Sequence, residues 1–475
     1  MEKFETRGKW WLPEQPRDQV AGILRFDPKD GATLEVIGDE LEQHIGIAGL
    51  SPQIDLICGF TKEGDAVTLY KSHRIGFTMS TGYLGSSYRV TVVFWGNLFE
   101  TVEEIVFESM LVNYSYLEDW VGISGLDGYA KQEKSGHINK MEVSYELPAQ
   151  QKFKIADFSL SFHHEMTLPH FEFKEVHAVQ KTFLEIMPDT PRHYDDYQKQ
   201  ILRPTRNFIC LGIGRATIPL VVRGKNKDHK LELDNGEIRQ RDTVIYYVAE
   251  GAGIPIKNLQ TGDMLFRFKD MSARFTEHLT TWFRLQPKLE PVLDLYFSLF
   301  YIPSIYTHLA FLSLAQALEN YHKQMYPEDG IYMPDDDFEG VKAELVKAIP
   351  SRVEKAHRAS MIRRMEYLNE FSLRNRVKAI LEKNLRDYSN ILNRLIPNRE
   401  IFVDRFVTTR NYYTHYDPEL KPKAVTDPTE LGRLTRRVIL VMQLCFLAEL
   451  GISGPEAEEL TKKATSFRNL SITDT

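Results

Sequence analysis

The hydrophobic pattern of the chain changes near residue 285. Before that point, apolar and polar residues alternate in short runs that are rich in β-branched and aromatic side chains. Asp27–Gly31 separates two such runs and predicts a hairpin turn. The clearest predicted strands are Thr33–Ile37, Ala66–Tyr70, Tyr88–Phe94, Phe153–Ile155, Phe158–Phe162 and Thr243–Val248. The first part is therefore predicted to be mainly antiparallel sheet, folded as a sandwich or a barrel.

From Pro287 onward the apolar residues recur at helical spacing instead. The pattern predicts a long helical stretch from Val292 to Tyr326 and then a series of shorter helices. These are Phe338–Ile349, Met361–Glu370, Ser372–Asn384, Asp387–Leu395, Arg399–Tyr416 and Glu430–Leu450, with another after Gly454. We therefore predict an α+β protein in two parts, a β-rich domain over residues 1–285 and an all-α bundle over residues 286–475.

Three segments of the first part depart from this alternation. Helices are expected near Val102–Met110 and Pro191–Arg203. The apolar run Phe208–Leu211 predicts a strand, and Gly212–Ala216 after it resembles half of a phosphate-binding loop. The third glycine and the downstream acid of that motif are missing, so a turn or a bulge is the better interpretation.

Charge is uneven along a chain whose formal net charge is −7 over 475 residues. Between Ser351 and Arg399, twelve Lys or Arg stand against five Asp or Glu, an excess of seven positive charges. Such a segment can hold a phosphate backbone, although a solvated helical face explains it equally well.

The cysteines and the apolar segments indicate where in the cell the protein is expected. Cys58, Cys210 and Cys445 are far apart and form no disulfide framework. The N-terminus carries no apolar signal core, and the apolar stretch Val438–Leu447 is too short to span a bilayer. We expect a cytoplasmic protein without a membrane partner.

The most informative chemistry lies in Arg410–His415, inside a predicted helix. Histidine can accept and donate protons near neutral pH, and arginine fits a phosphate. Asn411 and His415 are four residues apart and share a helix face, whereas Arg410 points about 140° away from His415. Arg410 would therefore reach back toward the histidine or line an adjacent wall of one cleft.

Spacing alone does not identify this site, because Arg352 and His357 repeat the Arg-x4-His spacing. A surface arginine and an ordinary helical histidine would look the same. Context favours the second copy, which follows an apolar helical face and ends before Pro418. Glu319, in the predicted long helix, could orient Arg410 or His415 from a facing helix, or it could be a solvated or structural acid.

Other catalytic motifs are weak or missing. His163, His164, His170 and His177 have no zinc-site spacing, so we expect structural or surface roles and no metal. Neither GxxxxGK[ST] nor GxSxG occurs, which removes support for P-loop ATPases and ordinary α/β-hydrolases. No cofactor is expected.

Both parts of the sequence resemble one known family. Gly8–Pro13, which contains two tryptophans that we expect to pack in the core, is followed by Val20–Leu24 and a strand ending at Gly38. This opening is similar to the N-terminal domain of the ApeA family. The helix containing Phe311–Glu319 and the late Arg410–Asn411–His415 pattern resemble the ApeA-type HEPN domain.

The resemblance implies an abortive-infection antiphage protein with a metal-independent HEPN endoribonuclease. His415 would deprotonate the RNA 2′-hydroxyl or protonate the leaving oxygen, Arg410 would stabilise the scissile phosphate, and Asn411 would orient the site. Glu319 would be a fourth member. The resemblance also implies tRNA as substrate, a homodimer formed through the HEPN domain, and a phage structural protein, such as a capsid protein, as trigger.

Two interpretations compete with a nuclease. HEPN domains also serve as non-catalytic interaction modules, in which case Arg410 and His415 would only support a dimer. The β-rich half could instead be a carbohydrate- or protein-binding domain joined to an unrelated helical tail.

Overall fold

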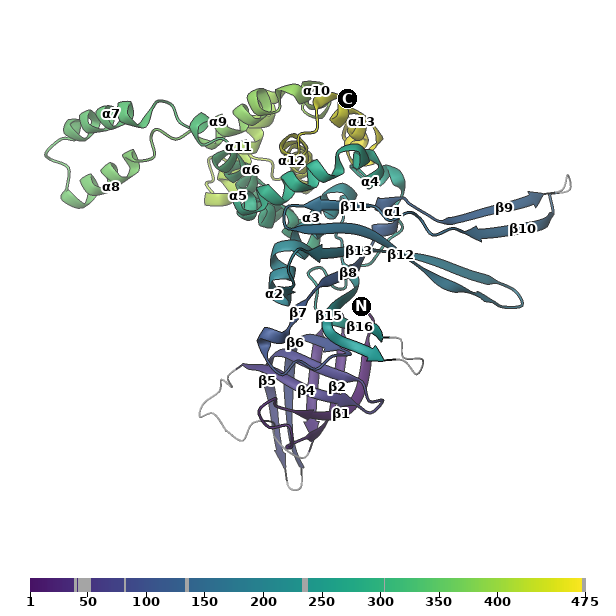
Figure 1. The fold of residues 1–475 in the computed structure, drawn as a ribbon. Coiled ribbons are helices and arrows are strands. Elements are labelled where there is room, and N and C mark those ends of the chain that lie inside the picture. The colour runs from purple at the N-terminus through teal and green to yellow at the C-terminus, as the bar shows by residue number, and fades with distance from the viewer. Residues whose placement is uncertain are drawn as a thin grey trace. The chain divides into compact units, whose positions relative to one another are not determined.

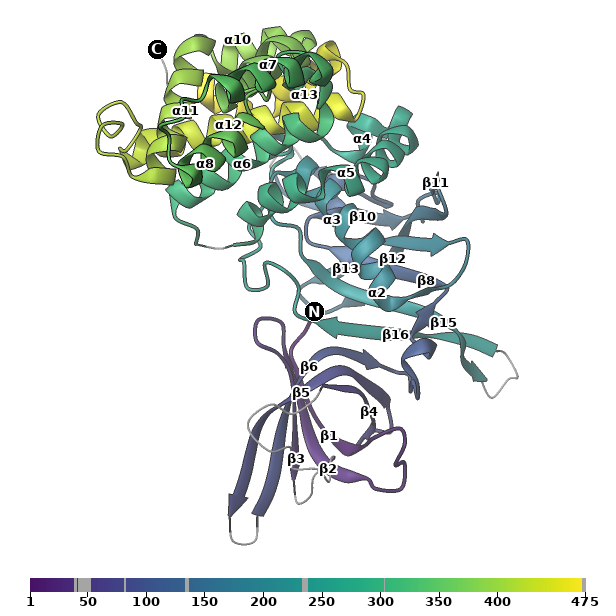
Figure 2. The same ribbon diagram turned by 90° about the vertical axis from the view of Figure 1, so that its left-hand side faces the viewer.

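The computed structural model describes residues 1–37, 41, 53–80, 83–132, 136–232, 238–302 and 304–471, so Gly38 lies outside the described residues. The chain divides into two compact units, Met1–Thr280 and Thr281–Thr475. The first unit is built around β-sheet and the second is helical (Figures 1 and 2). A β-rich antiparallel domain followed by a helical domain was predicted from the sequence, and this fold class is confirmed.

Six strands close into a barrel at the start of the first unit (Figure 2). The order β6-β3-β2-β1-β4-β5 returns to β6, because β5 pairs with both β4 and β6. In a closed barrel each of these six strands has a neighbouring strand on both sides, so none is an edge strand. The strands are β1 (Phe4–Trp11), β2 (Val20–Asp27), β3 (Gly31–Ile37), β4 (Ile54–Thr61), β5 (Ala66–Ser80) and β6 (Tyr83–Trp95).

Trp10 fills the barrel interior and explains the glycines around it. Its side chain is fully buried, as expected from the sequence, among residues that include Leu24, Leu34 and Val67. A Cβ on Gly59 would lie 2.2 Å from the Trp10 ring, and one on Gly22 would lie 2.9 Å from it. Glycine is therefore needed at both positions, because the indole packs directly against the backbone of β2 and β4.

The same sheet continues beyond the barrel. β16 pairs with Val92–Trp95 of β6, on the edge that β3 uses at residues 85–90. From β16 the order runs β15, β8, β13, β12, β11, and every pairing is antiparallel. These strands are β8 (Ser109–Tyr114), β11 (Lys152–Ile155), β12 (Phe158–Phe171), β13 (Val176–Pro188), β15 (Pro219–Glu232) and β16 (Ile238–Tyr247). Two small sheets pair β7 (Val106–Phe107) with β14 (Arg192–His193) and β9 (Leu126–Gln132) with β10 (Ile138–Tyr145).

The helices of this unit correct two predictions. The helix expected near Val102–Met110 is only a 3-10 turn, Val102–Glu104, followed by β7 and the start of β8. The strand expected at Phe208–Leu211 is part of α3 (Arg203–Ile213), which continues from α2 (Tyr194–Asp196) and a π-helical segment, Tyr197–Leu202. All four residues of that run are buried, and a short apolar run buried on every side does not reveal its period.

Short helices also pack at the end of the β-rich unit. Trp120 of α1 (Leu117–Val121) contacts Phe208 of α3, and Phe268 of α4 (Phe268–Met271) contacts Phe162 of β12. Gly214 ends α3 with a φ of 73°, so the glycine motif is a helix C-cap and not a phosphate loop. 3-10 turns occupy Thr261–Asp263 and Ser272–Arg274.

The second unit is an all-α bundle whose first helix starts earlier than the pattern predicted. α5 runs from Phe275 to Tyr301 and contains both Pro287 and Pro291. The residue boundary proposed at 285 and 286 falls inside this helix. The other helices are α6 (Thr307–Met325), α7 (Asp335–Ala348), α8 (Lys355–Met365), α9 (Leu373–Ala379) with a π-helical extension to Asn384, α10 (Ser389–Leu395), α11 (Arg399–His415), α12 (Pro428–Glu449), α13 (Gly454–Lys463) and α14 (Thr465–Ser471).

α7 and α8 form a pair that extends away from the other helices of the unit (Figure 1). Arg358 of α8 donates to the carbonyl oxygens of Val346 and Ile349, which satisfies the C-terminal end of α7. The helix predicted at Met361–Glu370 was misplaced, because α8 ends at Met365. Asn369 instead exchanges hydrogen bonds with the backbone of Met333, which holds the residues after α8 in a loop.

None of the described helices has both the length and the hydropathy that crossing a bilayer requires.

Candidate functional site

The helix that carries the Arg-x4-His pattern has defined ends. The Asn398 side chain accepts a hydrogen bond from the backbone N–H of Ile401 at 3.0 Å and so caps α11. At the other end, Tyr416 adopts a φ of 51° and donates its N–H to the carbonyl of Tyr412. The predicted helix therefore exists, and His415 is its last residue.

α11 is held against its neighbours by its buried face. Phe402, Val403, Phe406 and Thr409 are buried, and Phe406 packs edge-to-face on Phe311 of α6. The hydroxyl of Thr409 accepts a hydrogen bond from the N–H of Val425 at 2.9 Å. This contact fixes the loop after α11, so the end of the helix is anchored on two sides.

Arg410, Asn411 and Glu319 lie together at this end. The Arg410 guanidinium donates to the side-chain oxygen of Asn411 at 3.1 Å and lies 3.5 Å from a carboxylate oxygen of Glu319, on α6. The side chains of Arg410 and Glu319 are 32% and 22% exposed. Such a pair limits the directions in which the guanidinium can point but still leaves it accessible to solvent and to a ligand.

His415 lies at the exposed end of the same helix. It makes no hydrogen bond or ion pair with any residue that the structure describes, and none joins it to Arg410, Asn411 or Glu319. The predicted set is thus brought together in part: three side chains contact one another, and the histidine lies one helical turn or more beyond them. An exposed imidazole with no competing partner is available to a bound substrate.

The second Arg-x4-His pair has a different local structure. His357 is exposed on α8, but Arg352 lies in the turn before that helix. The two residues therefore do not share one helix, and Arg352 has no carboxylate or amide partner in the described part of the chain. Of these two pairs, the one on α11 lies on a single continuous helix, and its arginine contacts the side chains of Asn411 and Glu319.

A cluster of aromatic side chains that was not predicted from the sequence lies on the same two helices, α6 and α11, as the candidate residues. The ring of His308, at the start of α6, stacks on Tyr413 with centroids 5.5 Å apart and planes 20° apart. Tyr412 and Tyr416 contact Tyr413 at 5.1 and 6.2 Å. Burial, followed by the neighbouring tyrosines, raises the pKa of Tyr413. Tyr306 next to His308 is 74% exposed and Tyr416 is 60% exposed, so the cluster presents ring surface to solvent. In the sequence, the close spacing of the tyrosines at 412, 413 and 416 indicates this aromatic cluster.

Part of the basic segment from Ser351 to Arg399 is used within the fold. Arg376 is 3% exposed, and three further cations pair with carboxylates, Arg374 with Asp404, Lys383 with Asp329 and Arg394 with Glu458. These contacts take up part of the predicted excess of positive charge.

The four histidines noted in the sequence have other neighbours in the structure. His163, His170 and His177 each lie near a glutamate, and His164 is buried against Thr182. Among the residues that the structure describes, no group of three or more His, Cys, Asp or Glu could hold a metal ion. The three cysteines are buried, and none of them is part of a disulfide.

Comparison with known proteins identifies both units. The model of ApeA N-terminal domain 1 matches residues 5–282, and the model of the Apea-like HEPN domain matches residues 312–455. Glu319, Arg410, Asn411 and His415 all lie within the second match. No curated protein and no solved structure matches the chain. The two domain matches support a role in antiviral defence, and the chain belongs to the ApeA family.

Proposed function

We propose that this protein is an abortive-infection ribonuclease whose HEPN domain cleaves RNA without a metal ion. The observation that carries the proposal is the end of α11. There Arg410 is held by Asn411 and Glu319, and the exposed His415 after it makes no hydrogen bond or ion pair with any described residue. An oriented cation and a proton-transfer group on one accessible helix end are what phosphodiester cleavage by the RNA 2′-hydroxyl requires.

In the proposed reaction, the 2′-oxygen attacks the adjacent phosphorus while its proton passes to a base. The bond to the 5′-oxygen of the next nucleotide breaks, and that oxygen takes up a proton. The products are a 2′,3′-cyclic phosphate and a free 5′-hydroxyl. His415 serves as the base or as the acid, and Arg410 stabilises the negative charge that grows on the phosphate oxygens. Asn411 and Glu319 position Arg410 by their contacts with its guanidinium.

The aromatic cluster supports single-stranded RNA as the substrate. Exposed rings stack on unpaired bases of any sequence, and sequence-specific RNA recognition usually targets unpaired loops. The stacked pair of Tyr413 and His308 and the ion pair of Arg410 and Glu319 join the same two helices, α11 and α6. An unpaired loop, as in tRNA, would place a base on the tyrosines and its phosphate near Arg410.

The proposed function also requires a substrate, a trigger and a second copy of the chain. The substrate is tRNA, a phage protein such as a capsid protein is the trigger, and the β-rich domain senses it. Two copies of the HEPN domain pair, so that two copies of α11 line one cleft and one His415 can act as base while the other acts as acid. This places the protein in the cytoplasm, where tRNA and newly made phage proteins meet.

The proposal is tested with the purified full chain, total tRNA, EDTA and phage lysate. Wild type and His357→Ala should cleave and leave 2′,3′-cyclic phosphate ends, whereas His415→Ala should not. His357→Ala is the matched control, because it removes an exposed helical histidine with the same spacing to an arginine. If all three proteins are inert in EDTA with lysate present, the domain is a non-catalytic adaptor. If cleavage occurs only without EDTA, it depends on a metal.

A further inference from the structure

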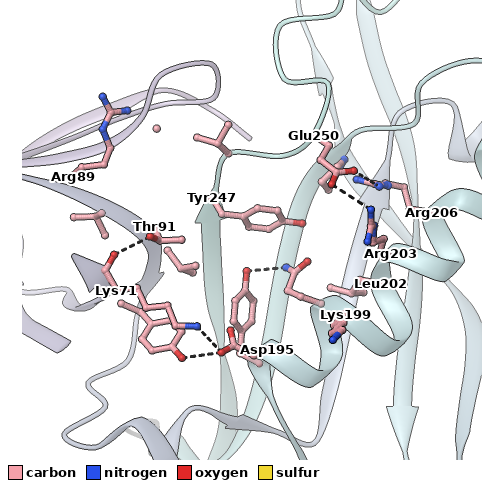
Figure 3. Close-up of a pocket in the computed structure, with 18 of the residues that line it drawn as sticks. Lys71, Arg89, Thr91, Asp195, Lys199, Leu202, Arg203, Arg206, Tyr247 and Glu250 are labelled. Carbon is pink, nitrogen blue, oxygen red and sulfur yellow. Dashed lines mark hydrogen bonds and ion pairs between the residues drawn. The ribbon is translucent and has the colours of Figure 1, made fainter. Parts of the chain in front are cut away.

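The β-rich unit contains a pocket of about 670 Å³ that the proposed nuclease chemistry does not use (Figure 3). Its volume lies within the range of small-molecule sites. The pocket lies where the barrel meets the continuation of the sheet. Residues of β5, β6, β8, the α2–α3 segment and the end of β16 all contribute to its lining.

One wall of the pocket is a single helix face. Asp195, Lys199, Leu202 and Arg206 line it at intervals of three or four residues, as residues on one side of a helix do, and Arg203 lies four residues after Lys199. The barrel supplies the facing wall, with Lys71, Arg89 and Thr91 (Figure 3). A molecule bound between them would contact both parts of the unit at once.

Positive charge exceeds negative charge in the lining. Five cations, Lys71, Lys199, Arg89, Arg203 and Arg206, stand against two carboxylates, Asp195 and Glu250, an excess of three. Lys71 lies 2.7 Å from Asp195, and Glu250 lies 2.6 Å from Arg206 and 3.9 Å from Arg203. Both carboxylates are thus already engaged, while Lys199 contacts no carboxylate within the described part of the chain. The remaining charge favours a ligand with several negative charges, such as a diphosphate.

The pocket also offers aromatic surface and neutral hydrogen-bonding groups. Figure 3 shows Tyr247 pointing toward the helical wall that carries Leu202 and Lys199. The amide of Gln198 donates to the hydroxyl of Tyr194 at 2.7 Å, which leaves the hydroxyl its own proton to donate. Burial raises the pKa of Tyr194 and of Tyr247, so both phenols stay neutral near pH 7. Rings and phenols of this kind suit a planar, polar group.

We propose that this pocket binds a nucleoside diphosphate, with its phosphates on Lys199 and Arg203 and its base beside Tyr247. Lys199 and Arg203 are four residues apart on the helical wall, so both can reach one diphosphate. An extended peptide is a poorer fit, because β6 is paired along both edges, by β5 on one side and by β3 and β16 on the other. Strand addition at this wall has no edge to use.

Titration calorimetry on the full chain tests the proposal with four nucleoside diphosphates (ADP, GDP, CDP and UDP), their nucleosides, and pyrophosphate. At least one diphosphate should bind in the micromolar range. It should bind at least about tenfold more tightly than its nucleoside, which lacks the charged hydrogen bonds of the phosphates, and than pyrophosphate, which lacks the base. Pyrophosphate binding as tightly as every nucleotide would overturn the proposal in favour of a simple anion site. Absence of binding by all four diphosphates, or tighter binding of an acidic peptide, would also overturn it.

Variants locate the binding within the chain. Lys199→Glu should weaken diphosphate binding by at least about tenfold without lowering the melting temperature of the unliganded protein, because Lys199 is exposed. Tyr247→Leu should reduce the preference for the nucleotide over pyrophosphate. Lys131→Glu, on the exposed strand β9, is the matched control and should bind as wild type does. Equal affinities of Lys199→Glu and wild type would place the nucleotide elsewhere.

Discussion

The helical unit contains two arginine groups that share α6 but differ in exposure. In one, Arg376 of α9 contacts His322 of α6 at 3.3 Å and Glu370 at 3.1 Å, and both Arg376 and His322 are buried. In the other, Arg410 of α11 contacts Glu319 of α6, and His415 is exposed. The same residue types can therefore stabilise a fold or meet a substrate, and solvent access decides which.

The protonation state of His322 follows from its neighbour. Arginine only donates hydrogen bonds, so Nδ1 of His322 must accept and the imidazole must be neutral, with its proton on Nε2. Burial, and then the Arg376 charge, lowers the pKa of His322 to about 4. A histidine held neutral inside the bundle is a structural group, which contrasts with the accessible imidazole of His415.

The largest expected effect comes from removing the buried arginine. Arg376→Leu should destabilise the helical unit by about 3 kcal/mol, because it leaves the acceptor nitrogen of buried His322 and the carbonyl oxygen of Phe371 without their donor. Arg410→Leu, which breaks a partly exposed pair, should cost less than about 1 kcal/mol. The urea midpoint followed by circular dichroism at 222 nm compares the two variants. Equal midpoints would remove the distinction between the two groups.

The next effect depends on pH. The pKa of His322 is lower in the folded chain than its ordinary value of 6.5. The stability that the neutral imidazole contributes is therefore complete above pH 6.5. That contribution should fall by about 3 kcal/mol as the pH drops from 6.5 to about 4, and the loss should be complete below the folded pKa. Urea midpoints across this range measure it.

A His322→Gln variant provides the control for that titration. It removes the imidazole, so its stability should change less between pH 6.5 and 4 than that of wild type. Carboxylates such as Glu370, whose pKa is lowered by Lys323 first, lose their contribution in a lower and overlapping window in both proteins. Parallel pH curves for the two proteins would rule out His322 as the source.

A smaller effect concerns RNA binding at the exposed group. Tyr413→Ala, made in a His415→Asn background to prevent cleavage, should weaken binding of a single-stranded RNA by about 2 kcal/mol, since one stacked base is lost. Tyr367→Ala removes a tyrosine outside the cluster that is 67% exposed, and it should leave affinity unchanged. Filter binding or fluorescence anisotropy measures both. A loss of equal size in the two variants would mean that the tyrosines bind RNA without a defined stacking site.

The smallest effect is expected at Glu319. Glu319→Gln keeps the shape of the side chain but removes its charge, so stability should change by less than about 1 kcal/mol. Cleavage should fall by a few-fold, because Arg410 is then held mainly by Asn411. Single-turnover cleavage rates check this. A loss as large as that of His415→Ala would make Glu319 a participant in proton transfer and not a positioning residue.

The sequence predicted the exposed group better than the buried one. Arg410, Asn411 and His415 are close in the chain on one helix, so their spacing was visible, and the apolar face before them predicted α11 correctly. Glu319 is 91 residues from Arg410, and only the packing of α6 on α11 brings the two together. The contact of Arg376 with His322 spans 54 residues and was not foreseen. A histidine four residues after Leu318 on an apolar stripe was its only local signal.

The fold shows the same limit. Alternating strands such as Tyr88–Phe94 were predicted correctly, whereas closure of the barrel depends on β5 pairing with both β4 and β6, which no local pattern encodes. Phe208–Leu211 was misassigned because a run that is buried on all sides carries no period.

In the proposed function, the exposed histidine His415 performs chemistry, whereas the buried histidine His322 maintains the fold. This difference is tested most directly by comparing His415→Asn and His322→Asn for tRNA cleavage in EDTA with phage lysate and for urea midpoint at pH 7. We predict that His415→Asn loses at least about a hundredfold in cleavage rate at an unchanged midpoint, whereas His322→Asn lowers the midpoint and still cleaves while folded. Cleavage by His415→Asn at the wild-type rate would contradict the account.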